Sequence, residues 1–142
     1  DNVLIEKESQ SLDNLHLIPA VSDDEYQSIL LECDVGLISL RRDFKTDNFP
    51  NKLLNYMEYE LPILASINAD NELLELISSY KNGLASINGE DEDFIMNAKI
   101  LLESKNLRND MGKRGKTLLA EKFDVKSSVN KINISLKSHE NL

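Results

Sequence analysis

The fold of this chain is decided by residues 34–67, which read DVGLISLRRDFKTDNFPNKLLNYMEYELPILASI. Residues 34–40 form an almost continuous apolar run, which is typical of a strand that a parallel sheet buries on both faces. Residues 41–49 are polar and lack periodicity, so we expect a loop there. Apolar spacing then predicts a helix over 51–60, and the apolar run 62–67 predicts a second strand.

Pro50 and Pro62 mark the two ends of the predicted helix. Proline suits the first turn because its missing N–H would have no partner there, and a proline beyond the last turn stops a helix. Leu53, Leu54 and Met57 are expected to form the buried stripe.

The same alternation continues on both sides of this stretch. Further strands are predicted at 14–18 and 83–87. Further helices are predicted over 2–12, 23–33, 90–103, 105–121 and 124–137. Asn68 or Asp70 is expected to cap another helix, which has Leu73, Leu74, Ile77 and Tyr80 on one face. This order predicts an α/β fold with a doubly wound parallel sheet. Four strands are few for such a sheet, which usually has about five or six, so we expect that N-terminal strands of the domain lie outside this sequence.

Two helices carry more detailed expectations. Ser22, followed three residues later by Glu25, is typical of a helix N-terminus with a reciprocal cap. Cys33 falls on the apolar face of the same helix and is expected in the core. The expected buried face of helix 90–103 consists of Phe94, Ile95, Ala98, Leu101 and Leu102.

Composition excludes several classes of protein. The 142 residues include 16 Lys and Arg against 25 Asp and Glu, a formal net charge of −9, which argues against a nucleic-acid binder because such proteins neutralise phosphates. Apolar residues make up 41%, enough for a core. The single cysteine and two distant histidines, His16 and His139, argue against a disulfide and against a zinc site. Neither a membrane span nor a signal peptide is recognisable.

The predicted loop between the first two strands of residues 34–67 is the best candidate site. In open α/β sheets, ligands bind beyond the carboxyl ends of the strands, and the N-terminus of the following helix attracts phosphate. Between residues 41 and 52, four cations oppose two anions, which gives a local charge of 4 − 2 = +2. The cations are Arg41, Arg42, Lys45 and Lys52. A phosphate site and a plain solvated loop fit this spacing equally well. The other basic cluster, Lys113, Arg114 and Lys116, is expected to be a solvated helix face.

The segment Asp47–Ser66, DNFPNKLLNYMEYELPILAS, resembles the signature region of retaining GT-B glycosyltransferases of the family 4 type. It is closest to a subset, common in bacterial O-antigen and capsule synthesis, that reads Phe-Pro-x-Lys-Leu-Leu-x-Tyr-Met and includes transferases for UDP-activated N-acetylfucosamine-type sugars. The resemblance extends to residues 13–40 and to Asn106–Phe123, where Met111 and Gly112 match the usual ending of the family.

The resemblance implies that residues 1–142 are one Rossmann-like domain, the C-terminal, donor-nucleotide-binding half of a GT-B enzyme. Asp47 would contact the hydroxyls of the donor sugar as the candidate catalytic residue, and Asn55 would bind the nucleotide ribose. The backbone of Ala20 and Val21 would meet the base. The residues that would approach the pyrophosphate are Phe49, Pro50, Asn51, Lys52 and Leu53.

Three departures from the family pattern affect these implied roles. Asp47 and Asn55 replace a pair of glutamates, and a neutral amide binds a ribose diol more weakly than a carboxylate does. Pro50 replaces a glycine and lacks an N–H, so the helix amides of residues 51–53 are expected to serve the phosphate instead. The basic pair that the family carries near the start of this domain is not found.

The resemblance also sets expectations for ligands and partners. The expected donor is a UDP-sugar, with no cofactor and no metal. The acceptor, a lipid-linked saccharide of surface polysaccharide synthesis, would be held mainly by an N-terminal domain that this sequence lacks, and the full protein would be cytoplasmic, at the inner face of the membrane. We expect the chain to bind UDP weakly and to transfer no sugar alone.

Three other functions remain open. A GT-B-fold sugar-nucleotide epimerase would use the same pyrophosphate site. A receiver-like signalling module would need an acidic residue at the end of a central strand, whereas Asp34 opens the predicted strand and Ser39 and Leu40 close it. A pure interaction module has no positive sign in the sequence.

Overall fold

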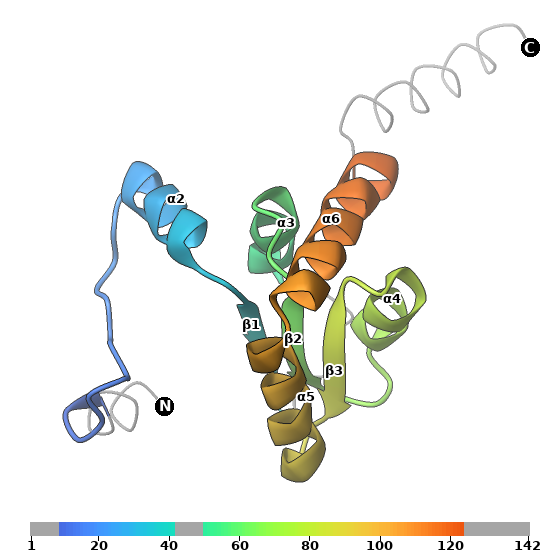
Figure 1. The fold of residues 1–142 in the computed structure, drawn as a ribbon, viewed down its shortest axis with the longest axis horizontal. Helices are drawn as coiled ribbons and strands as arrows, with labels where there is room; N and C mark the ends of the chain where they lie inside the picture. The colour runs from blue at the N-terminus through green and yellow to red at the C-terminus, as the bar shows by residue number, and fades with distance from the viewer. Residues whose placement is uncertain (1–8, 42–49, 124–142) are drawn as a thin grey trace, which may run out of the picture. The chain divides into compact units, whose positions relative to one another are not determined.

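The computed structural model describes residues 9–41 and 50–123. The chain divides into two compact units, Asp1–Glu32 and Cys33–Leu142. The first contains helix α2 (Asp23–Glu32). The second contains, in chain order, β1 (Gly36–Ser39), α3 (Asn51–Glu58), β2 (Ile63–Ile67), α4 (Glu72–Tyr80), β3 (Gly83–Ile87), α5 (Asp91–Glu103) and α6 (Lys105–Lys122) (Figure 1).

The described strands form one parallel sheet in the order β1-β2-β3. In its register, Leu37, Leu64 and Leu84 lie side by side across the sheet. The serine row Ser39, Ser66 and Ser86 lies two residues further along each strand, so it is on the same face. The prediction of a parallel sheet from the three apolar runs is confirmed.

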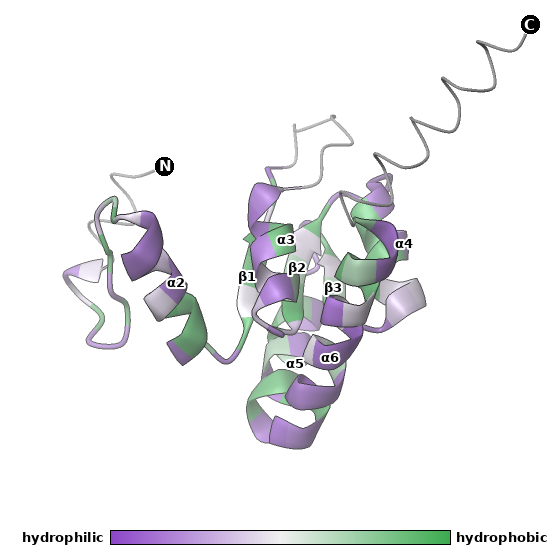
Figure 2. Cartoon of the chain, turned by 90° about the horizontal axis from the view of Figure 1, so that it is seen from above, coloured by the Kyte–Doolittle hydropathy of each residue, from purple (hydrophilic) through white to green (hydrophobic). Residues whose placement is uncertain are grey.

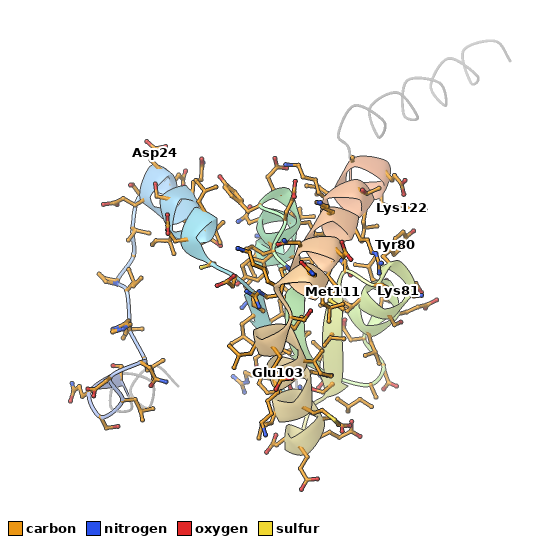
Figure 3. The ribbon with its side chains drawn as sticks, in the orientation of Figure 1. Asp24, Tyr80, Lys81, Glu103, Met111 and Lys122 are labelled. Carbon is orange, nitrogen blue, oxygen red and sulfur yellow. The ribbon has the colours of Figure 1, made fainter. Side chains whose placement is uncertain are left out.

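Helices cover both faces of this sheet. One buried cluster joins strand residues such as Ile38 and Ala65 to α3, α4 and the C-terminal half of α6. A second cluster, on the opposite face, joins Leu64 to α5 and to Met111 of α6, which Figure 3 labels. Hydrophilic and hydrophobic residues interleave along α5 and α6 in Figure 2, as amphipathic helices require. This is the predicted doubly wound α/β arrangement, consistent with a Rossmann-like domain.

The strand predicted at 14–18 is wrong. Residues 15–20 have no regular structure, and Leu17 and Ile18 are about half exposed. The N–H of Leu15 bonds the carbonyl of Leu12, a local turn contact. An apolar pattern cannot form a strand unless a neighbouring backbone supplies ladder partners, and the three described strands pair with one another. Helices 2–12 and 124–137 were predicted over residues that lie largely or wholly outside the described part.

Some predicted core positions are exposed. Cys33 follows the last residue of α2 and is exposed, so its expected place in the core is wrong. Leu54 is 37% exposed, Ile95 51% and Leu102 79%. A helix buries one stripe about three to four residues apart, and that stripe consists here of Leu53 and Met57 in α3 and is centred on Leu101 in α5. Apolar residues next to the stripe point away from it.

The contact between α3 and α6 depends on a glycine. An ideal Cβ on Gly112 would overlap the carbonyl oxygen of Glu60. Glu60, just after α3, has a left-handed backbone with φ 55°, and the Nζ of Lys116 bonds the carbonyl of Glu58 at 3.1 Å. The family-like Met-Gly pair at residues 111–112 therefore has a local explanation: only glycine lets α6 approach the turn that leads into β2.

A pair of alanine substitutions tests this contact. Gly112→Ala is expected to destabilise the fold by about 1–3 kcal/mol, because a side chain there forces backbone apart. Gly115→Ala places its Cβ 3.4 Å from the Cγ of Met57, an ordinary contact, and improves helix propensity by up to about 1 kcal/mol. Thermal unfolding followed by circular dichroism should therefore show a lower Tm than that of the wild type for Gly112→Ala only. Equal Tm changes in both variants would contradict the close approach.

The predicted cap of α2 is confirmed. The N–H and the hydroxyl of Ser22 donate to Oε2 of Glu25 at 2.9 and 2.7 Å, and the N–H of Glu25 donates to Oγ of Ser22 at 3.4 Å. The two bonds that the Glu25 carboxylate accepts, chiefly the one from the backbone N–H of Ser22 and then the one from its hydroxyl, hold the pKa of the Glu25 carboxyl below its usual value because they favour the ionised form.

The cap predicts a pH dependence of α2. A carboxyl whose pKa is lower in the folded state stabilises that state above its unfolded pKa, and this contribution is lost as pH falls through the folded pKa. We expect NMR titration of the Glu25 carboxyl carbon to give a lower pKa in the wild type than in a Ser22→Ala variant. An unchanged titration curve would mean that the Ser22 hydroxyl does not bond the carboxylate in solution, because the backbone N–H of residue 22 remains in the variant.

Candidate functional site

The carboxyl edge of the sheet is where α3 begins. The ring of Tyr56 lies against Gly36, the first residue of β1, and its hydroxyl donates to the carbonyl of Leu37 at 3.3 Å. A helix that joins two parallel neighbours runs back along them. Asn51 therefore lies about 7.5 Å from Tyr56 along the helix axis, and β1 spans about 10 Å. The first residues of α3 lie beside the end of β1.

The start of α3 presents backbone amides. Pro50 is its N-cap residue, with φ −60° and ψ 132° and no side-chain cap. The first N–H groups of a helix have no partner within the helix, and they carry the positive end of its dipole. The N–H of Leu53 already bonds the carbonyl of Pro50 at 2.8 Å, and its side chain is fully buried. Asn51 and Lys52 therefore hold the amides best placed for an anion.

The side chains at this end of α3 are polar. Asn51 and Asn55 are exposed and one turn apart, so they share a face of the helix. Lys52 is half-buried, and Arg41, two residues beyond the end of β1, is exposed. The predicted site residues at the start of α3, Asn51 and Lys52, therefore lie at the carboxyl edge of the sheet.

The structure does not describe where the remaining predicted site residues lie relative to this edge. Ala20 and Val21 are exposed in the coil before α2, in the first unit, and their contact with a base stays a prediction. Four predicted residues lie outside the described part of the chain: Arg42, Lys45, Asp47 and Phe49.

An amide network at the same edge was not predicted. The Nδ2 of Asn88 donates to the carbonyl of Leu40 at 2.7 Å and to Oδ1 of Asn68 at 2.8 Å. Its Oδ1 accepts from the hydroxyl of Ser66 at 2.9 Å, and the Nδ2 of Asn68 donates to the carbonyl of Arg41 at 3.2 Å. The side chains come from the ends of β2 and β3, and they bond the backbone where β1 ends.

One feature of the sequence could have predicted this network: polar residues directly follow the apolar strands. Asn68 directly follows β2, and Asn88 directly follows β3. The sequence instead predicts Asn68 or Asp70 as the cap of the next helix. That expectation is wrong, because Asn71 caps α4 by accepting from the N–H of Leu73 at 2.9 Å.

The other edge of the sheet has a different chemistry. Asp34 lies before β1, and its carboxylate pairs with Arg108 of α6 at 3.0 Å. Arg108 also donates to the carbonyls of Leu101 and Leu102 at the end of α5.

Ser39 is the last residue of β1. The described strand therefore lacks an acidic residue at its carboxyl end, which counts against a receiver-like module.

A parallel α/β sheet with a helix N-terminus at its carboxyl edge is typical of nucleotide-binding domains. The chain matches the family described as glycosyl transferases group 1 over residues 4–118, and it belongs to this family. Its fold is therefore that of a GT-B glycosyltransferase domain, and its family transfers sugars. The curated proteins and the solved structures gave no match. Among the described residues, no helix is both long and apolar enough to cross a membrane.

Proposed function

We propose that the carboxyl edge of the sheet binds the diphosphate of a nucleotide-sugar donor in a retaining glycosyltransferase. The observation that carries the proposal is the start of α3: the amides of Asn51 and Lys52 lie at that edge in a chain of the glycosyl transferases group 1 family. A helix N-terminus of this kind binds phosphate through its N–H groups and its dipole.

The chemistry follows from the charge of the leaving group. As the sugar departs, negative charge grows on the nucleoside diphosphate, and preorganised donors and cations stabilise that charge. Lys52 and Arg41 supply cations, and Arg42 and Lys45 add to them in the sequence. Asp47 contacts the sugar hydroxyls and Asn55 the ribose, as the family resemblance implies.

The finer assignment rests on residues 49–57, FPNKLLNYM, which follow the pattern of the O-antigen and capsule subset. The donor is a UDP-sugar, of the L-fucosamine type in that subset, and the acceptor is a lipid-linked saccharide of surface polysaccharide synthesis. Residues 1–142 form the donor-binding domain, another domain holds the acceptor, and neither a metal nor a cofactor takes part. The full protein works in the cytoplasm at the inner face of the membrane.

Titration of the protein with UDP, GDP and TDP tests the proposal. We expect heteronuclear NMR to show shifts of the amides of residues 51–55 with UDP, and smaller shifts with the other two nucleotides. Shifts at Ala20 and Val21 would support their contact with the base. The absence of shifts with all three nucleotides would contradict the donor site.

Labelled sugars test the reaction. A UDP-sugar whose label moves to an acceptor identifies a transferase, whereas epimerisation of the same sugar identifies the alternative GT-B activity. Transfer by the 142-residue chain itself would contradict the assignment of acceptor binding to another domain.

A lysine substitution tests the anion site. Lys52→Ala is expected to weaken UDP binding about three- to tenfold, because a charge-assisted contact with phosphate is lost. Isothermal titration at two salt concentrations measures the loss, which should shrink in high salt as the charge is screened.

The matched control is Lys113→Ala, which removes an exposed lysine on α6, from the cluster assigned to a solvated face. It should leave the affinity unchanged within about twofold. Equal losses in the two variants would show that only the net charge of the chain matters.

A further inference from the structure

We propose that Asn88 is a positioning residue for the donor site. Its side-chain amide fixes the peptide at which the chain leaves β1, and so sets the start of the segment that leads to α3. This inference rests on the proposed function, because the positioned segment is the one that carries the donor contacts.

The side chain of Asn88 ties three separate parts of the chain together. It donates to the carbonyl of Leu40 beyond β1, donates to Oδ1 of Asn68 beyond β2, and accepts from the hydroxyl of Ser66 within β2. Asn68 in turn donates to the carbonyl of Arg41. Two successive carbonyls of the departing backbone, those of Leu40 and Arg41, are therefore held by side-chain amides.

The orientation of the Asn88 amide follows from its partners. The carbonyl of Leu40 can only accept, so the nitrogen of Asn88 must face it. The second hydrogen of that nitrogen reaches Oδ1 of Asn68, which leaves the Asn88 oxygen for the Ser66 hydroxyl. The side chain of asparagine can make all three hydrogen bonds at once. An aspartate would keep the bond from Ser66 but would face two oxygens with a charge and no hydrogen.

The sheet itself does not need this side chain. The N–H of Leu40 bonds the carbonyl of Ser66 at 3.0 Å, and the N–H of Asn88 bonds the carbonyl of Ile67 at 2.8 Å. These backbone bonds complete the pairing at the edge of the sheet, and Asn88 belongs to neither apolar cluster. Its amide acts on the part of the backbone that the ladder leaves free, the Leu40 carbonyl.

Positioning of this kind affects ligand binding as well as stability. A displacement of about 1 Å can cost about 100-fold in rate, and a misplaced diphosphate contact weakens binding for the same reason. The three part-buried hydrogen bonds of Asn88 also contribute to folding, so binding and stability are measured separately. The segment from Leu40 to Lys52 contains every cation of the +2 stretch and ends in the amides proposed for the diphosphate.

The test compares Asn88 with Asn97. Asn97 of α5 also donates its amide to a strand carbonyl, that of Ala85 at 3.3 Å, but it does not touch the end of β1. Leucine removes the amide at similar size and without charge, and aspartate removes the donors and adds a charge. We expect Asn88→Leu and Asn88→Asp each to weaken UDP binding about tenfold or more, while Asn97→Leu and Asn97→Asp stay within about twofold.

Two further measurements make each outcome decisive. The Tm of each variant is measured first, so that UDP affinities are compared at a temperature at which all variants are folded; Asn88→Leu is expected to lose more Tm than Asn97→Leu, because it removes three hydrogen bonds and not one. The amide chemical shifts of Arg41 and of residues 51–53, recorded without nucleotide, should change in the Asn88 variants and not in the Asn97 variants. Unchanged UDP affinity in Asn88→Leu overturns the inference, and so does a loss confined to Asn88→Asp, since that loss would be an effect of charge.

The proposed function can fail separately. If the wild-type protein binds none of the nucleotides, the donor site is wrong, and the chemical shifts alone then decide whether Asn88 positions the segment. Shifts confined to the Asn88 variants would support that role, and shifts equal to those in the Asn97 variants would overturn it.

Discussion

Because β1, β2 and β3 pair in parallel and in register, their carboxyl ends reach one edge of the sheet, and the chain turns there after every strand. Each turn brings polar backbone to the edge, and that backbone needs hydrogen-bond partners. The side chains of Ser66, Asn68 and Asn88 meet this need where β1 ends. The same pairing forces α3 to run back along the sheet, which brings its N-terminus to the edge. The candidate site is thus a consequence of strand direction.

Two close approaches at glycines keep that helix in its place. Gly36 lets the ring of Tyr56 lie on β1, and Gly112 lets α6 reach the turn at Glu60. Neither glycine touches the candidate site, yet both set how α3 lies on the sheet. They show how a family pattern outside the candidate site, such as the Met-Gly pair, can affect the geometry of that site through packing alone.

Much of the fold could be predicted from the sequence. The strand at 83–87 and the helices around Leu53 and Leu101 were predicted because runs and stripes of apolar residues are local signals. The strand predicted at 14–18 failed because a strand also needs a partner, which no local pattern supplies. For the site, the helix start at Asn51 and Lys52 was predicted from Pro50, whereas the role of Asn88 was missed.

The sequence by itself determined the alternation of strands and helices, the cap at Ser22 and Glu25, and the family, because each depends on residues near one another along the chain or on a spaced motif. Only the tertiary structure decided which polar groups meet. Asn88 and Leu40 are 48 residues apart, and their bond exists because β1 and β3 both pair with β2 and end at one edge. Register is a property of paired backbones, so no single segment encodes it.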